Sequence, residues 1–277
     1  MPIPIYTTVP EIRLACAGKK VALVPTMGAL HEGHAALIRA AAEAAEFAVV
    51  SIFVNPTQFG PKEDFAKYPR TLESDRAISA EAGAHAIFAP NAEEMYPAGT
   101  VAFVEVPGLD GVLCGPRRPG HFRGVCTVVL KLFNIVQPEV AIFGAKDAQQ
   151  SIILKKMAKD LNVPVRMQIE PTVREADGLA MSSRNRYLTA EDRAQAPKIY
   201  RALRTIQTRV NHGETDAARL ESALQAELAA IPGARLDYAE IRDAETLESV
   251  GRLDCPALAA VAVFLGTTRL IDNAMLG

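Results

Sequence analysis

Residues 21–34, with the sequence VALVPTMGALHEGH, decide the fold of this chain. The apolar run at residues 21–24 predicts a buried strand, and the Ala-rich segment at residues 34–45 predicts a helix. Gly28 stands between them and can adopt the positive φ of a sharp turn. The local order is therefore strand, tight turn, helix.

Two histidines follow this turn at the expected start of the helix. His31 and His34 are three positions apart, so they lie on one face of the first helical turn. A helix N-terminus offers unpaired N–H groups and partial positive charge, and imidazoles there can also carry a proton, so the pattern favours a polyphosphate ligand. Two plainer interpretations stay open. One is a zinc site, although the spacing is not His-Glu-x-x-His and the chain has no Cys-x-x-Cys pair. The other is that both histidines are surface residues of a capped helix.

Strands and helices are expected to alternate along the first half of the chain. Further strands are predicted at residues 47–54, 85–88, 139–143 and 165–169, and further helices at residues 71–82, 126–136 and 146–161. Repeated β-α-β units predict an α/β fold with a doubly wound parallel sheet. In such a sheet the ligand lies beyond the carboxyl ends of the strands.

The second half of the chain has a different pattern. Helices predicted at residues 189–211 and 216–230 precede strands predicted at residues 236–241, 261–265 and 269–273, which indicates a smaller α+β domain. We expect the boundary near residues 171–178 and assign residues 1–173 to the first domain and 174–277 to the second.

Composition limits the possible partners and compartment. The chain has 277 residues, a formal net charge of −2 and no tryptophan, so nothing predicts bulk attraction to nucleic acid or to an anionic membrane. No signal peptide is recognised, and the apolar runs are too short to span a bilayer. The four cysteines are far apart. We therefore expect a reduced, cytoplasmic protein.

Two clusters in the first domain carry polar side chains at expected turns. Gln58, in NPTQFG at residues 55–60, follows a predicted strand and offers donors and an acceptor, although a loop glutamine facing water is the plainer interpretation. The loop GPRRPGHFRG at residues 115–124 contains Arg118 among three arginines. Its guanidinium groups suit carboxylate or phosphate, and a solvated basic turn is the equal alternative.

Two further clusters carry positive charge. In FGAKD at residues 143–147, Lys146 follows a predicted strand and shares a helix face with Gln150. An exposed lysine beside a capping aspartate is the plainer interpretation there. The segment MSSR at residues 181–184 places two hydroxyls and a guanidinium in a row at the expected domain junction. A loop in that place can close over a triphosphate.

Taken together, these motifs resemble a known family. MGALHEGH resembles the HIGH signature of the nucleotidyltransferase superfamily, and MSSR resembles its KMSKS loop. The ordered set PTMGALHEGH, FVNPTQFGP, YPRTLESD, GVLCGPRRPGHFRGV, FGAKD, READGLAMSSRNRYLT and LGTTRLIDN is similar to the pantoate–β-alanine ligases, from about residue 25 to residue 273. The chain departs from that pattern at Ala145 and Ala148, where the family usually has an acidic and an aromatic residue.

The resemblance implies a Rossmann-like first domain, a C-terminal lid domain and a homodimer. It implies an ATP- and Mg²⁺-dependent ligase that joins pantoate to β-alanine through a pantoyl adenylate, releases AMP and pyrophosphate, and makes the coenzyme A precursor pantothenate. It gives no protein ligand for the metal. The implied catalytic residues are His31, His34, Lys146 and Arg184, with His34 as proton donor. The implied ATP-binding residues are Met27, Gly28, Ala29, Leu30, His31, Glu32, Gly33, His34, Gly144, Ala145, Lys146, Asp147, Val173, Met181, Ser182, Ser183 and Arg184. The implied substrate-binding residues are Gln58, Gln150 and Arg118.

Two other functions remain possible at this point. A simple nucleotidyltransferase would need a second phosphate-binding cluster, for which the loop at residues 115–124 is the candidate. The second possible function is a nucleotide-binding module without turnover. The presence of His31, His34, Lys146 and Arg184 argues against it. No side chain is identified as the base that deprotonates an incoming amine.

Overall fold

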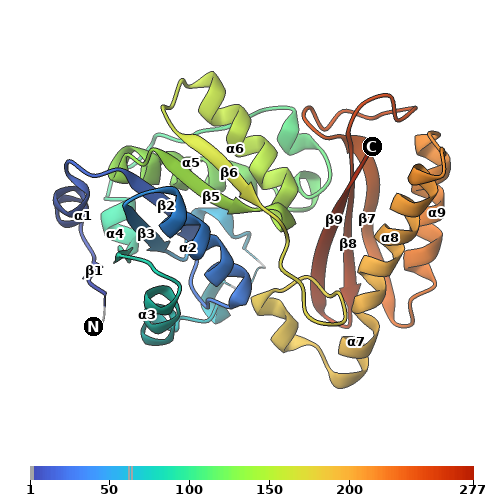
Figure 1. Cartoon of the computed structure of the whole chain (residues 1–277), viewed down its shortest axis with the longest axis horizontal. Helices are drawn as coiled ribbons and strands as arrows, with labels where there is room; N and C mark the ends of the chain where they lie inside the picture. Colours follow the sequence, from blue (N-terminus) through green and yellow to red (C-terminus); the bar gives the residue numbers. More distant parts are fainter. Residues whose placement is uncertain (1–2, 62, 64) are drawn as a thin grey trace. The chain divides into compact units, whose positions relative to one another are not determined.

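The computed structural model describes residues 3–61, 63 and 65–277 (Figure 1). The chain divides into two compact units. The first comprises Met1–Ala145 and Ile153–Pro171, and the second comprises Lys146–Ile152 and Thr172–Gly277. Nothing in the sequence indicated that the short segment Lys146–Ile152 would join the second unit.

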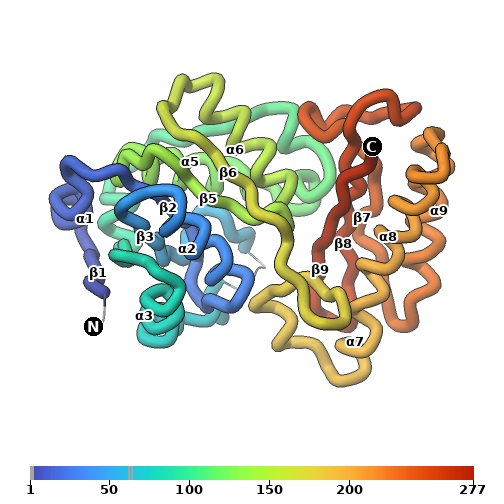
Figure 2. Tube along the Cα trace, in the orientation of Figure 1, coloured from blue at the N-terminus to red at the C-terminus, as the bar shows by residue number. Residues whose placement is uncertain are grey.

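The first unit contains a six-stranded sheet in the order β1-β4-β3-β2-β5-β6. Figure 2 traces the path of the chain. Every neighbouring pair is parallel, which confirms the predicted doubly wound sheet. The strands are β1 (Ile5–Tyr6), β2 (Val21–Thr26), β3 (Phe47–Ile52), β4 (Ala86–Phe88), β5 (Val140–Gly144) and β6 (Arg166–Glu170).

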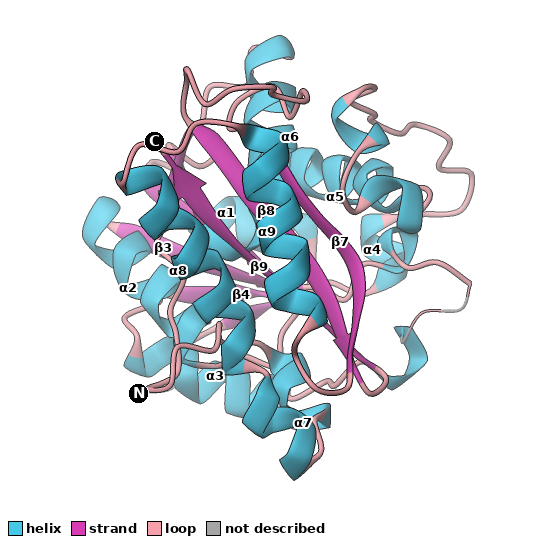
Figure 3. Cartoon of the chain, turned by 90° about the vertical axis from the view of Figure 1, so that its right-hand side faces the viewer, coloured by secondary structure: helices cyan, strands magenta, loops and turns pink. Residues whose placement is uncertain are grey.

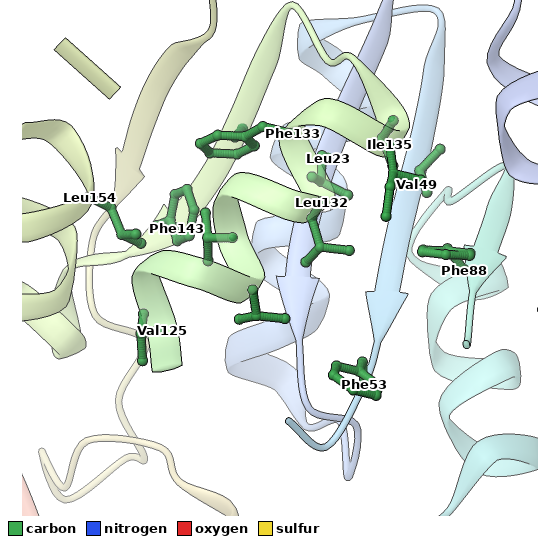
Figure 4. Close-up of a cluster of buried hydrophobic side chains, with 14 of the residues drawn as sticks. Leu23, Val49, Phe53, Phe88, Val125, Leu132, Phe133, Ile135, Phe143 and Leu154 are labelled. Carbon is green, nitrogen blue, oxygen red and sulfur yellow. The ribbon is translucent and has the colours of Figure 1, made fainter. Parts of the chain in front are cut away.

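Successive residues of each strand point to opposite sides of this sheet, and the residues on each side join a different apolar cluster. Both faces of the sheet are therefore buried. Leu23, Val49 and Phe88 join the cluster that includes α5 (His121–Val136), as Figure 4 shows. The next residues along two of these strands, Val24 and Val50, join the cluster on the other face with Ile38 of α2 (Glu32–Ala44). The strands are therefore continuous apolar runs, which is the signal that made them predictable.

Several elements of the first unit differ from their predictions. Strand β1 and helices α1 (Val9–Cys16) and α4 (Ala92–Met95) were not predicted from the sequence. For α1 a signal was present, because Thr8 and Glu11 form a capping box. Helix α5 begins at His121 and not at residue 126, so the end of the predicted basic loop is helical. Gly120 precedes it with φ of 80°, a left-handed conformation that glycine adopts without strain.

The remaining elements of the first unit are short or lie close to their predictions. They are α3 (Leu72–Glu81), η1 (Pro56–Gln58), η2 (Phe65–Lys67), η3 (Leu109–Gly111) and η4 (Gly115–Arg117). After β5 the chain forms η5 (Ala145–Asp147) and then α6 (Ala148–Asp160), whose residues fall in both units. The predicted helix at residues 146–161 is thus a 3₁₀ turn followed by an α-helix.

The second unit contains a three-stranded antiparallel sheet in the order β7-β8-β9. Its strands are β7 (Ala234–Asp243), β8 (Ala257–Leu265) and β9 (Thr268–Leu276). Helices α8 (Pro197–Asn211) and α9 (Ala217–Ala229) lie side by side against this sheet (Figure 3). Their apolar side chains form a second core with Val261 and Val263 of β8. This arrangement confirms the predicted smaller α+β part of the fold.

The single helix predicted at residues 189–211 is wrong. The segment forms α7 (Ala190–Gln195) and α8, which are separate helices joined at Ala196. Proline at position 197 has no N–H to continue the ladder of α7, but it suits the first turn of a new helix. Thr189 is the N-cap of α7, since its hydroxyl accepts the Asp192 N–H at 3.1 Å.

Within the described part of the chain, no helix combines the length and the apolar character needed to cross a membrane.

Candidate active site

The turn between β2 and α2 has a backbone that few residues can adopt. Gly28 has φ of 81°, and Ala29 follows with φ of 51°. A Cβ atom at Gly28 would lie 2.9 Å from Asp75 Oδ2 and 3.1 Å from Ile52 Cγ2. Position 28 therefore needs glycine for both its dihedral angle and its close contacts.

His31 and His34 cap the N-terminus of α2. His31 Nδ1 accepts the Gly33 N–H at 3.1 Å, and His34 Nδ1 accepts the His31 N–H at 3.3 Å. The centroids of the two rings are 4.1 Å apart. Backbone N–H groups can only donate, so Nδ1 of each ring carries a lone pair in this arrangement. The hydrogen on each ring then sits on Nε2, beside the helix N-terminus.

Gln58 lies close to the same turn. It ends η1, is half-buried, and receives a hydrogen bond on Oε1 from Asn55 Nδ2 at 3.1 Å. Its own Nε2 contacts Met27 Sδ at 3.1 Å, just beyond β2. The interpretation of Gln58 as a water-facing loop residue is therefore wrong.

Asn55 organises this corner of the site and was not singled out from the sequence. The side chain is 1% exposed, and its Nδ2 also donates to the carbonyl of Gly124 in α5 at 3.1 Å. Its Oδ1 accepts from the Tyr96 hydroxyl at 2.9 Å. The available signal was an asparagine following a buried strand, at the sheet edge where ligands bind.

Gly124 allows α5 to approach η1 closely. A Cβ atom there would lie 2.5 Å from the Thr57 carbonyl oxygen and 2.7 Å from the Gln58 Cα. Both neighbours are backbone atoms, so neither can move aside by rotating a side chain. The place of Gln58 thus depends on the absence of a side chain at position 124.

Arg118 is held by a carboxylate in the structure. Its Nε and Nη2 donate to the two carboxylate oxygens of Glu63 at 2.7 and 2.6 Å, and its side chain is only 19% exposed. Burial alone would raise the pKa of Glu63, but the hydrogen bond and charge of Arg118 outweigh burial, and the pKa lies below its ordinary value. The alternative of a solvated basic turn is therefore wrong for Arg118.

His121 connects Arg118 to the backbone of Gln58. Its Nδ1 is 2.9 Å from the Gln58 carbonyl oxygen, and its Nε2 is 2.9 Å from Arg118 Nη1. A carbonyl only accepts and a guanidinium only donates, so Nδ1 carries the hydrogen and Nε2 the lone pair. His121 therefore bridges Arg118 and Gln58, with its Nδ1 and Nε2 in the reverse roles of those at His31 and His34.

The other two arginines of the loop point to separate partners. Arg117 Nη1 donates to the Leu113 carbonyl at 2.7 Å, and the Arg123 guanidinium lies 4.0 Å from the centroid of the Phe103 ring. Arg123 also pairs with Glu105 at 3.5 Å. These contacts give no support to a second phosphate-binding cluster in this loop.

In the second unit, Lys146 is fixed through its backbone. Its carbonyl oxygen accepts from Asn273 Nδ2 of β9 at 2.9 Å. The Lys146 side chain is half-buried, whereas Asp147 is exposed. Gln150, four residues further on, lies half-buried in α6.

The segment at residues 181–184 forms a braced loop in the same unit. The Met181 N–H donates to the Val173 carbonyl at 3.0 Å, and an isolated bridge joins Arg174 to Ala180. Ser182 then caps the 3₁₀ helix η6 (Ser183–Tyr187), where its hydroxyl accepts the Arg184 N–H at 3.2 Å. These contacts bring Val173 next to Met181 at the start of the loop.

Strand β9 connects Lys146 to that loop. Asp272, next to Asn273, accepts two hydrogen bonds from Arg174 at 2.7 and 2.9 Å. The Arg174 guanidinium also lies 3.5 Å from the centroid of the Tyr200 ring. No role for Arg174 or Asp272 was predicted, because their sequence separation hid the pairing.

The structure thus sorts the predicted site residues into two sets. Residues of the first unit are Met27, Gly28, Ala29, Leu30, His31, Glu32, Gly33, His34, Gln58, Arg118, Gly144 and Ala145; residues of the second are Lys146, Asp147, Gln150, Val173, Met181, Ser182, Ser183 and Arg184. Among the described residues, no group of three or more His, Cys, Asp or Glu side chains gathers where it could hold a metal ion.

Comparisons with known proteins place the whole chain in one family. The family model for pantoate-beta-alanine ligase matches residues 5–275. A pantothenate synthetase of Moorella thermoacetica is 55% identical over 259 residues, covering 94% of this chain and 92% of that protein. A pantothenate synthetase of Pelotomaculum thermopropionicum is 51% identical over 278 residues, covering 99% of each.

Solved structures agree with these relatives. The crystal structure of pantothenate synthetase from Thermus thermophilus has a TM-score of 0.95 at 46% identity, and the match covers 98% of this chain and 99% of that one. The pantoate-beta-alanine ligase of Francisella tularensis, solved in complex with beta-gamma ATP and beta-alanine, has a TM-score of 0.80 at 33% identity, covering 99% and 97%. From its family model, its relatives and its fold, this chain belongs to the pantoate–beta-alanine ligase family of carbon–nitrogen ligases.

Proposed function

We propose that this protein condenses pantoate with β-alanine to give pantothenate, a coenzyme A precursor, in two steps driven by ATP. A pantoate carboxylate oxygen attacks the α-phosphorus of ATP, the bond from that phosphorus to the bridging β-phosphate oxygen breaks, and pyrophosphate leaves. The β-alanine nitrogen then attacks the pantoyl carbonyl carbon, the bond to AMP breaks, and the amide forms with loss of a proton from the amine.

The two steps are needed because a carboxylate is a poor acylating agent. Direct attack by an amine would have to expel oxide, whereas the adenylate expels AMP. The first step builds negative charge on the leaving pyrophosphate and on the α-phosphate, so the protein's main task is to stabilise that charge.

The capped start of α2 is the observation that carries this proposal. The cap bonds put a hydrogen on Nε2 of both His31 and His34, and a phosphate oxygen accepts from such a group. We assign His34 as the proton donor to the phosphates, with His31, Lys146 and Arg184 as the other catalytic residues. The proposed ATP-binding set is the one given by the resemblance: residues 27–34, residues 144–147, Val173 and residues 181–184.

We assign pantoate binding to Gln58, Gln150 and Arg118. Asn55 and Met27 fix the amide of Gln58, and Arg118 supports the Gln58 backbone through His121. A preorganised amide of this kind suits a hydroxyl- and carboxylate-bearing substrate, because its donors and acceptor are already oriented. Gln58 is also the proposed contact to β-alanine.

We propose that ATP enters as its magnesium complex. Mg²⁺ keeps several waters and binds through phosphate oxygens with few protein carboxylates. The absence of a three-ligand acidic cluster among the described residues fits a cation that arrives with the nucleotide. In that complex the metal neutralises part of the phosphate charge.

We further propose that residues 1–173 act as the nucleotide- and pantoate-binding domain, that residues 174–277 act as a lid, and that the protein is a homodimer. Val101 and Phe103 are 84% and 40% exposed, and we take these apolar side chains as part of the dimer contact. Light scattering coupled to size exclusion should give twice the 29.8 kDa mass of the chain. A monomer at micromolar concentration would contradict the dimer.

Pyrophosphate exchange tests the reaction. Labelled pyrophosphate should enter ATP only when pantoate is present, and AMP should accumulate after β-alanine is added. We expect His34→Ala and Lys146→Ala each to slow the burst of pyrophosphate by more than tenfold. For His34→Ala the loss should reach about 10²–10⁴, the usual contribution of a positioned proton donor. Lys155→Ala, at an exposed lysine of α6, the helix that follows Lys146, is the matched control and should change nothing.

The rival functions give different results in the same assay. A simple nucleotidyltransferase would show exchange with a phosphorylated acceptor and no AMP release on addition of an amine. A binding module without turnover would bind ATP and show no exchange. Normal bursts in both His34→Ala and Lys146→Ala would remove the assigned roles.

A further inference from the structure

We propose that Asp75 is a positioning residue of the nucleotide site, which fixes the turn that places His31 and His34. This inference rests on the proposed function, in which the two histidines contact the phosphates of ATP. Asp75 lies in α3, forty-one residues after His34, and ends the segment YPRTLESD at residues 68–75, to which no role is assigned from the sequence.

The carboxylate of Asp75 is buried and hydrogen-bonded to the turn. The residue is 1% exposed. Its Oδ2 accepts the Ala29 N–H at 3.0 Å, and its Oδ1 accepts the Leu30 N–H at 2.8 Å. Oδ1 also accepts from the Thr71 hydroxyl at 3.1 Å. A buried carboxylate is tolerated only with such bonds, so the turn and the carboxylate stabilise each other.

The turn needs this support because of its backbone. Gly28 and Ala29 are two consecutive residues with positive φ, and alanine rarely adopts that conformation. Successive N–H groups in such a turn form a concave site for an anion. Here the anion is the chain's own Asp75, which holds Ala29 in a conformation that its Cβ disfavours.

The position of the turn is transmitted directly to the histidines. Leu30 immediately precedes His31, and the His31 N–H donates to His34 Nδ1 at 3.3 Å. A relaxed turn would therefore displace the N-cap and both rings together. Because the amides of Ala29 and Leu30 are bonded to Asp75, we assign the phosphate contacts of this segment to the histidine side chains and the residues beside them.

Asp75→Asn tests the inference. The carboxamide has almost the same volume, but it replaces one accepting oxygen with an NH₂ group that cannot accept from a backbone N–H. We expect the Kd for ATP, measured by calorimetry, to rise at least tenfold. The Kd for pantoate should stay within threefold of that of the wild-type protein, and hydrogen exchange should accelerate at the amides of Ala29 and Leu30. Glu73→Gln, an exposed acid in the first turn of the same helix, is the matched control and should leave all three unchanged.

Two results would overturn the inference. One is an ATP affinity within threefold of the wild-type value although the two amides exchange faster. The other is a parallel fall in the affinities for ATP and pantoate together with the melting temperature, which would mean a purely structural role. If the wild-type protein itself does not bind ATP, the proposed function fails, and this inference fails with it.

Thr71→Val is a milder second variant in case Asp75→Asn does not fold. It removes only the hydroxyl that donates to Asp75 Oδ1. We expect a two- to fivefold weakening of ATP binding with unchanged pantoate binding. Equal weakening of both, or of neither, would overturn the inference.

Discussion

Gly124→Ala should move Gln58 without altering any polar group. Gly124 lies in α5, and the new Cβ would sit 2.5 Å from the Thr57 carbonyl oxygen and 2.7 Å from the Gln58 Cα. Ordinary contacts begin at 3.4 Å, so helix and turn must separate by nearly 1 Å. Because both neighbours are backbone atoms, the displacement passes directly to Gln58.

The expected magnitudes follow from this displacement. Overpacking a buried site lowers the free energy of unfolding by about 1–3 kcal/mol. Alanine in place of a helical glycine raises it by roughly 1 kcal/mol. The net loss in the free energy of unfolding should therefore be about 0–2 kcal/mol. The bond from Asn55 Nδ2 to the Gly124 carbonyl oxygen, now 3.1 Å, spans this contact and would lengthen beyond hydrogen-bonding distance. Misplacing one buried hydrogen-bonding group costs about 1–3 kcal/mol, so the Kd for pantoate should rise by about tenfold or more.

Denaturant unfolding and calorimetry with pantoate measure these two effects. Gly111→Ala is the control, since a Cβ at Gly111 meets no atom within 4 Å. Both its stability and its pantoate affinity should match those of the wild-type protein. If Gly124→Ala retains wild-type affinity for pantoate, the contact between α5 and η1 does not place Gln58, and the reasoning is refuted.

Two further predictions concern single side chains. Gln58→Ala should raise the Kd for pantoate at least tenfold, because a buried polar ligand loses its hydrogen-bonding partner, and should leave the Kd for ATP nearly unchanged. Calorimetry with each ligand measures both constants. An unchanged Kd for pantoate would contradict the prediction. Asp243→Asn should lower the free energy of unfolding by about 1 kcal/mol at pH 7. The effect is small because solvent screens the interactions of this largely solvated carboxylate. Backbone hydrogen bonds from Thr246 and Glu245 hold the pKa of Asp243 at about 2, below its value of 3.8 in an unfolded chain. Its contribution is therefore complete above pH 4 and disappears as the pH falls towards 2, so unfolding curves of the two proteins should converge there. A difference that persists at pH 2 would contradict this assignment.

Much of the first unit could be predicted because its strands are buried on both faces. Residues 21–24 and 47–54 are continuous apolar runs, and such runs followed by helical periodicity predict a parallel sheet directly. The boundaries were less predictable. Helix α5 starts five residues before its expected position, because Gly120 and its neighbours have the composition of a loop although His121 and Phe122 are buried in the helix.

The local part of the candidate site could also be predicted. The two histidines come from a short stretch of sequence whose spacing brings their rings together. The supporting residues could not be predicted, because their partners are distant in sequence. Asp75 meets Ala29 across 46 positions, and Arg174 meets Asp272 across 98. No periodicity records such a contact; only the folded sheet brings these residues together.

The direction of oxygen transfer tests the central claim most directly. Pantoate labelled with ¹⁸O in its carboxylate is incubated with the protein, ATP, Mg²⁺ and β-alanine, and the products are analysed by mass spectrometry. Attack of the carboxylate on the α-phosphorus places one ¹⁸O atom in AMP and none in pyrophosphate, which is the result we predict. Unlabelled AMP, or label recovered in inorganic phosphate with ADP as the product, would contradict an acyl adenylate.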